Sequence, residues 1–161
     1  MKRTLVVYFS RTGYTQRVAE FIADAAGADC ERIRERSARA GVLGYLRSAR
    51  EALRKSVVEI EPASANPRDY ALVVLGTPVW AGNMSSPIRT YIAEHKLDFA
   101  RVALFCTQGG SGGEKVLRAI ADLCGRSPVA TVCFNDSEID RDLHSAKVRA
   151  FTAAFAERKA A

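Results

Sequence analysis

An α/β fold with a doubly wound parallel sheet is predicted by three features of the sequence. Short apolar runs rich in β-branched and aromatic residues alternate with segments whose apolar residues recur at helical spacing. Gly27 and Gly125 each directly follow such a helical segment, where glycine commonly ends a helix. The alternation has no internal repeat, and strands separated by helices pair in parallel through right-handed crossovers. We therefore predict one domain over residues 1–161, a five-stranded parallel sheet with helices on both faces.

The predicted strands differ in polarity. The runs 4–9, 71–75 and 102–106 are apolar throughout or nearly so, as expected of strands buried on both faces. The run 129–134 is the last strand. The polar segment 30–34 suits the edge of the sheet.

Helices are predicted between the strands and after the last one. Apolar residues at helical spacing indicate helices over 18–25, 41–55, 86–92, 116–124 and 148–155. Ser86 is the expected N-cap of the third of these, with Pro87 at its first helical position. The segment 62–67, with a proline at each end, is expected to be a loop.

Composition excludes several classes of protein. Apolar residues make up 48% of the chain and charged residues 26%, which is typical of a globular rather than a disordered chain. The uncharged stretch 70–88 holds prolines and polar residues, and the run 5–9 is too short for a signal peptide. We therefore expect a cytoplasmic protein without membrane contact. The four cysteines show no C-x-x-C spacing and the two histidines are scattered, so free thiols and no metal site are expected.

The formal net charge is +6, and much of the positive excess lies in the arginine-rich segment 31–55. Such a segment could attract an anionic partner or could be a solvated helix face, and the sequence leaves both open. Nucleic acid is an unfavoured partner. Tyr45 is the only aromatic residue among those arginines, and a surface that stacks on bases needs several aromatic side chains.

In a doubly wound sheet, ligands bind beyond the carboxyl ends of the strands, which directs attention to three loops. The first, 10–15, carries the hydroxyls of Ser10, Thr12 and Thr15 with Gly13 between them, and leads into a helix N-terminus. Free N–H groups and the positive dipole end there favour a phosphate. A simple helix cap needs only one hydroxyl. Neither a Walker A loop nor a G-x-G-x-x-G fingerprint is present.

The other two loops could hold a flat ring. Loop 77–83 carries the chain's single tryptophan, Trp80, outside the predicted core stripe. Its indole could face an aromatic ligand, or it could pack on a helix or a partner protein. Loop 107–113 is glycine-rich, so a ligand could lie directly against backbone N–H groups, although a plain surface loop has the same composition.

Taken in order, these motifs resemble the flavodoxin superfamily over nearly the whole chain. The resemblance is strongest at 8–15 (YFSRTGYT), which contains the S-x-T-G-x-T pattern of the superfamily's FMN phosphate loop, then at 69–80 and 107–112. It implies the strand order 2-1-3-4-5 and the cofactor FMN. The phosphate would be bound by Ser10, Thr12, Gly13 and Thr15 with the backbone of Arg11 and Tyr14. The isoalloxazine ring would be lined by Pro78, Val79, Trp80, Ala81, Gly82 and Asn83, and at its pyrimidine end or other face by Thr107, Gln108, Gly109, Gly110 and Gly113.

Two functions fit this resemblance. One is an FMN-binding electron carrier with a redox partner protein, and the other is an NAD(P)H-dependent FMN or quinone oxidoreductase. The chain is basic where carrier flavodoxins are typically acidic, and its third loop lacks acidic and aromatic residues, as in the reductases of the superfamily. A response-regulator module is disfavoured, because Phe9-Ser10 and Gly76-Thr77 stand where the phosphotransfer acids would be. No residue is predicted to be catalytic, since a flavin itself carries the electrons.

Overall fold

The computed structural model describes residues 2–36 and 58–157. The helix predicted over 41–55, and with it most of the arginine-rich segment, lies outside the described residues. The described elements, in chain order, are β1 (Lys2–Tyr8), α1 (Tyr14–Ala26), β2 (Asp29–Arg32), η1 (Pro67–Asp69), β3 (Tyr70–Trp80), β4 (Asn83–Met84), α3 (Ser86–His95), η2 (Lys96–Asp98), β5 (Val102–Gln108), α4 (Gly113–Cys124), β6 (Thr131–Asn135), α5 (Asp136–Asp140) and α6 (Ser145–Glu157).

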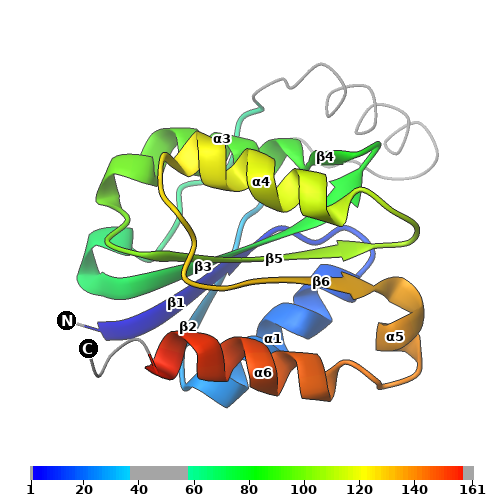
Figure 1. Ribbon diagram of the computed structural model, residues 1–161. Helices are drawn as coiled ribbons and strands as arrows, with labels where there is room; N and C mark the ends of the chain where they lie inside the picture. Colours follow the sequence, from blue (N-terminus) through cyan, green and yellow to red (C-terminus); the bar gives the residue numbers. More distant parts are fainter. Residues whose placement is uncertain (1, 37–57, 158–161) are drawn as a thin grey trace.

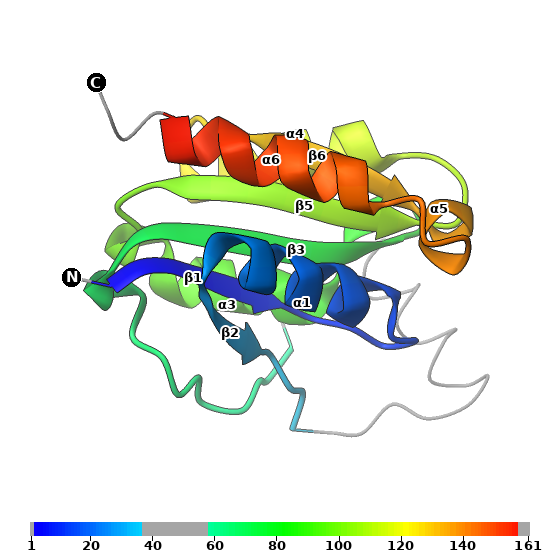
Figure 2. The ribbon, with the colours of Figure 1, turned by 90° about the horizontal axis from the view of Figure 1, so that it is seen from below.

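The sheet has the strand order β2-β1-β3-β5-β6, and all neighbours in this order pair in parallel. This confirms the predicted five-stranded parallel sheet and its order. A short strand that was not predicted, β4, pairs antiparallel with the end of β3. Figure 1 shows α3 and α4 on one face of the sheet and α1 and α6 on the other. In Figure 2, which is seen from below, α1 and α6 lie side by side in front of the sheet.

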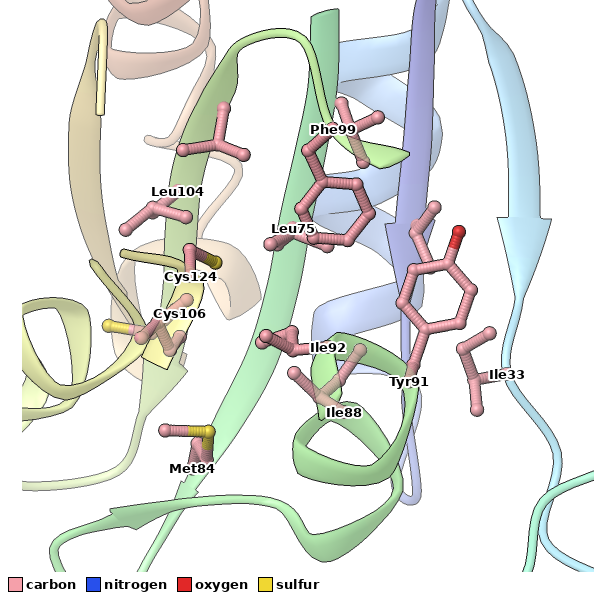
Figure 3. Packing of buried hydrophobic residues seen from close by; sticks show 14 of the residues in the cluster. Ile33, Leu75, Met84, Ile88, Tyr91, Ile92, Phe99, Leu104, Cys106 and Cys124 are labelled. Atoms are coloured by element: carbon pink, nitrogen blue, oxygen red, sulfur yellow. The ribbon is translucent and has the colours of Figure 1, made fainter. Parts of the chain in front are cut away.

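Alternate residues of the central strands enter two separate cores. Val73 and Leu75 of β3 face α3 and α4 in the core shown in Figure 3, whereas Leu72 and Val74 face α1 and α6. A strand inserted between two helical layers must be apolar on both faces, because neither face meets water. This is why the apolar runs predicted the buried strands correctly.

Several observed boundaries of strands and helices differ from the predicted ones. Strands β3 and β5 continue to Trp80 and Gln108, because their pairing extends beyond the apolar run to Pro78 and Thr107. The first strand covers 2–8 rather than 4–9, the edge strand 29–32 rather than 30–34, and the last strand 131–135 rather than 129–134. The N-cap of α3 is Ser85, one residue before the predicted Ser86, since the Ser85 carbonyl accepts the N–H of Arg89 at 3.1 Å.

The short helix α5 was missed by the sequence analysis, and its first turn is held by Glu138. One carboxylate oxygen of Glu138 accepts the backbone N–H of Asn135 at 2.9 Å, and Lys147 donates to the same carboxylate at 2.7 Å. These bonds, the one from Lys147 foremost, hold the pKa of Glu138 below its usual value. The contribution of Glu138 to stability is thus present above the ordinary glutamate pKa and is lost as pH falls through the lowered one.

Replacing Glu138 by alanine is expected to lower the free energy of unfolding by about 1 kcal/mol at neutral pH, the usual size of a lost helix cap. Urea unfolding followed by circular dichroism measures the change. Glu94→Ala, at an exposed position of α3, is the matched control and should have little effect. The difference between wild type and Glu138→Ala should shrink as the pH is lowered below the glutamate range, and a difference independent of pH would contradict the assignment.

Candidate flavin site at the carboxyl edge of the sheet

The structure brings the three predicted loops together at the carboxyl edge of the sheet. The hydroxyls of Thr15 and Thr107 lie 2.8 Å apart and join the first loop to the third. A Cβ placed on Gly112 would lie 3.4 Å from the Cα of Gly82, so the third loop also contacts the second. The three segments are distant in the chain and form one continuous surface, as expected where parallel strands end together.

The first loop is shaped around Gly13, whose φ of 101° lies in the left-handed region. The hydroxyl oxygen of Ser10 accepts the N–H of Gly13 at 3.1 Å. Ser10 and Thr15 are buried, whereas Thr12 is exposed at the tip of the loop. No side chain caps α1, and its first turn has no acidic residue. The N-terminal N–H groups of a 13-residue helix therefore face the site, together with neutral hydroxyls, which is a donor set suited to a phosphate.

Arg32, at the end of the edge strand β2, supports the same loop. The Arg32 guanidinium donates to the backbone carbonyl of Ser10 at 3.1 Å and to the side chain of Gln16 at 3.1 Å. This holds the loop against β2 and places a positive charge beside it. Arg11 is half-buried and Tyr14, the first residue of α1, donates its hydroxyl to Asp140 at 3.1 Å.

The second loop is a tight β-hairpin rather than the open loop predicted over 77–83. Pro78, Val79 and Trp80 belong to β3, and Asn83 begins β4 directly opposite Trp80. Only Ala81 and Gly82 form the turn, with φ values of 46° and 73°. Two positive φ angles are typical of the type I′ turn, which matches the twist of the paired strands. The sequence carries no Asn-Gly or Asp-Gly signal there, which is why the hairpin was not predicted.

The hairpin is anchored to the core by two buried hydroxyls. The Thr77 hydroxyl donates to Ser85, and the backbone N–H of Ser85 donates to Thr77 at 2.9 Å. Both residues are fully buried. The base of the hairpin is thus fixed while Ala81 stays exposed at its tip.

Trp80 is more buried than predicted. Only 9% of it is exposed, and its indole meets the ring of Phe9 edge-on, with the centroids 5.4 Å apart and the planes at 86°. The expectation that Trp80 lies outside the core is therefore wrong. β3 continues as far as Trp80, which brings the indole to Phe9, the residue that precedes the first loop.

The third loop presents mainly backbone. Gly109, Gly110 and Ser111 are exposed, and Gly112 adopts a φ of 103° as the N-cap of α4. Gln108 and Gly113, which were predicted to contact the flavin ring, are hydrogen-bonded within the protein. The Gln108 side chain accepts the N–H of Gly113 at 2.8 Å and donates to Asn135 at 3.0 Å. These bonds hold the loop between β5 and β6.

Two neighbours of the site were not predicted. Phe9 was assigned to the first strand, and Asp136 belongs to α5. The Asp136 carboxylate lies 3.2 Å from the position that a Cβ on Gly109 would take, and burial, then the charge of Asp140, raises its pKa. The rule that ligands lie beyond the ends of parallel strands could have indicated Asp136, since it follows the last strand directly.

The described residues contain neither a cluster of metal-ligating side chains nor a membrane-spanning helix. Across residues 2–36 and 58–157, no three histidine, cysteine, aspartate or glutamate side chains are grouped as a metal site would require. Within the same ranges, no helix is long and apolar enough to cross a bilayer.

The strand order and the glycine and hydroxyl loop after β1 define a flavodoxin-like α/β protein. The family model for flavodoxin matches residues 3–133, so the chain belongs to the flavodoxin family. A search of the curated proteins found no match.

Among solved structures, the chain is similar to a flavoprotein from Lactobacillus acidophilus NCFM in complex with FMN, with a TM-score of 0.72 and 24% identity over 88% of this chain and 98% of that one. It is also similar to the flavodoxin of Megasphaera elsdenii, with a TM-score of 0.60 and 20% identity over 94% of this chain and 98% of that one. A WrbA-like flavodoxin from Agrobacterium tumefaciens matches with a TM-score of 0.51 and 18% identity over 95% and 98%. These three likenesses concern the fold.

Proposed function

We propose that the protein binds FMN at the carboxyl edge of its sheet and transfers electrons through it. The observation that carries the proposal is that the three loops meet at the edge of the sheet where the uncapped N-terminus of α1 lies. Membership of the flavodoxin family supports the same cofactor. Bound FMN supplies the electron-carrying ring, and the protein positions it and sets its electrostatic surroundings.

The donor set of the first loop fits the phosphate of FMN. The hydroxyl of Thr12 is exposed at the loop tip, and Gly13 has open space where a Cβ would stand. The absence of a carboxylate from the first turn of α1 removes the group that would repel a dianion. Ser10 and Thr15 shape the loop from beneath through their bonds to Gly13 and Thr107.

The ring would lie between the hairpin and the glycine-rich loop. Gly82 and Gly112 approach each other at the floor of this region, so both segments can meet one flat ligand. Trp80 would contact the ring through the part of its indole that Phe9 does not cover. Backbone N–H groups of Gly109 and Gly110 are available to polar atoms of the ring, because both residues are exposed and neither has a side chain.

Electron transfer to a partner protein is the role we favour. The chain is basic overall, but the rim beside the third loop carries acidic residues, among them Asp136 and Asp140 on α5. The carboxylates of Asp136 and Asp140 next to the cofactor would attract a basic redox partner, although the chain as a whole is positively charged.

An NAD(P)H-dependent FMN or quinone oxidoreductase is the second candidate. It is favoured by the third loop, where Gly109, Gly110 and Ser111 are exposed and offer no aromatic side chain to cover the ring. A substrate could then stack on the uncovered face. Adding NADPH anaerobically to the FMN-loaded protein separates the two roles: persistence of the flavin absorbance over minutes supports a carrier, and rapid bleaching supports the oxidoreductase.

Replacing Thr12 by alanine tests the phosphate assignment. The hydroxyl can form a hydrogen bond to a charged group, worth about 1.5–3 kcal/mol, so the Kd for FMN should rise roughly tenfold or more. Riboflavin, which lacks the phosphate, should bind wild type and variant alike. Titration calorimetry with both ligands gives the comparison.

Thr131→Ala is the matched control. Thr131 is an exposed threonine at the start of β6, at the amino edge of the sheet and therefore away from the candidate site. It should leave both affinities unchanged. Equal losses for FMN and riboflavin in Thr12→Ala would show that Thr12 does not bind the phosphate. A wild-type protein that takes up neither ligand would overturn the proposed function as a whole.

A further inference from the structure

Two cysteines on neighbouring strands stand directly opposite each other. Cys106 of β5 and Cys133 of β6 are register partners in a parallel pair. Both side chains are on the face covered by α4, Cys106 within the core and Cys133 packed against it (Figure 3 labels Cys106). Adjacent strands lie about 4.7–4.9 Å apart, which is inside the range of about 4.4–6.8 Å between the Cα atoms of a disulfide.

The two sulfurs also approach each other. A Cβ placed on Gly113 would lie 2.4 Å from the Sγ of Cys133 and 3.0 Å from the Sγ of Cys106, so both sulfurs border one small space. The two thiols are therefore close enough to influence each other's protonation. Gly113 leaves the room that this arrangement needs, because any side chain there would displace the sulfurs.

The environments of the two thiols differ. Cys106 is fully buried, whereas Cys133 is only half-buried on the edge strand β6. The neighbouring Cys106 thiol lowers the pKa of Cys133 against the effect of burial, and the charge of Lys147 acts in the same direction. The ammonium of Lys147 donates to the backbone carbonyl of Cys133 at 3.2 Å. Glu138 and Glu114 oppose this shift. The pKa of Cys106 is raised by the neighbouring Cys133 thiol and by burial.

We propose that Cys106 and Cys133 are a redox-active dithiol that a hydroperoxide oxidises to a disulfide. The thiolate of Cys133 attacks the outer oxygen of the peroxide, the O–O bond breaks, and the alcohol or water leaves with one proton. The sulfenic acid formed on Cys133 is then attacked by the sulfur of Cys106, which reacts from the thiol form: its proton leaves with the hydroxyl group of the sulfenic acid as water, and the S–S bond forms. The two thiols together lose two electrons, which reduce the peroxide. This step does not depend on FMN.

The remaining cysteines lack these features. Cys30 is an exposed residue, but partial burial of its thiol and the nearby Glu20 raise its pKa to about 11. Cys124 is buried, which raises its pKa to about 11. Both should stay as thiols near neutral pH, since the thiolate is the reactive form.

The test treats the full-length protein with hydrogen peroxide in the dark near neutral pH, then blocks free thiols and maps peptides without reduction. We expect trypsin to release peptide 102–115 linked to peptide 127–141, at a mass about 2 Da below their sum, because two hydrogen atoms are lost. A parent variant with Cys30→Ser and Cys124→Ala should give the same link. If that variant folds poorly, the peptide map of the wild-type protein alone tests whether Cys106 and Cys133 become linked.

Two single variants test the order of the steps. With Cys106→Ala, dimedone should trap a sulfenic acid on Cys133, since the resolving thiol is gone. With Cys133→Ser, Cys106 should remain a thiol over the same time. The proposal is overturned if no linked peptide forms while Cys133 oxidises further, or if Cys106 alone reacts as fast as Cys133 alone.

Discussion

Replacing Gly76 by alanine is expected to lower the free energy of unfolding by about 2–3 kcal/mol, the cost of forcing a methyl group into a filled core. A Cβ at this position would lie 2.0 Å from the tip of the Phe105 ring, the register partner of Gly76 on β5. Phe105 is fully buried and also meets Phe134 edge-on, so its ring has little room to move. Urea unfolding followed by far-UV circular dichroism measures the loss.

Gly110→Ala is the matched control, because Gly110 is exposed and has open space around a Cβ. Its free energy of unfolding should lie within about 0.5 kcal/mol of the wild-type value, as is usual for surface substitutions. A double variant with Phe105→Leu tests the cause: removing the ring tip should make Gly76→Ala cost much less than it does alone. If the cost is unchanged, contact with the ring is not the reason for glycine at this position.

Replacing Trp80 by alanine is expected to cost about 3 kcal/mol of unfolding free energy, near the lower end of values for a buried tryptophan. The indole is buried and rests edge-on against Phe9, so its loss leaves a cavity beside the turn of the hairpin. Trp80→Phe keeps an aromatic edge and should cost clearly less. Circular dichroism gives the readout, since the chain's single tryptophan is removed.

Leu97→Ala is the control for Trp80, because Leu97 is a large apolar residue that is 87% exposed. It should have little effect on stability. If Trp80→Ala is as stable as wild type, the contact with Phe9 does not support the hairpin. With FMN bound, Trp80→Phe should also quench flavin fluorescence differently from wild type, and unchanged quenching would show that the indole does not touch the ring.

The arrangement of the sheet was predictable because burial on both faces leaves a strong signal in the sequence. Strands such as 71–75 and 102–106 are apolar at every position, and helices between them require parallel pairing. The loop around Gly13 was also recognisable, since its hydroxyls and glycine are close together in the chain. The Ala81-Gly82 turn carries no such local signal. The start of α5 does carry one, the capping-box spacing of Asn135 and Glu138, which was overlooked.

The alternation of strands and helices, the parallel pairing and the hydroxyl and glycine residues of the first loop follow from the amino-acid sequence alone, because local periodicity and chain connectivity determine them. The order of the strands was implied by the resemblance to the flavodoxin superfamily. The burial of Trp80, the contact of Gly82 with Gly112 and the meeting of Cys106 with Cys133 were decided only by tertiary structure. Each of these joins segments far apart in the chain. Which side chains meet across two strands depends on register and close packing, which no local pattern specifies.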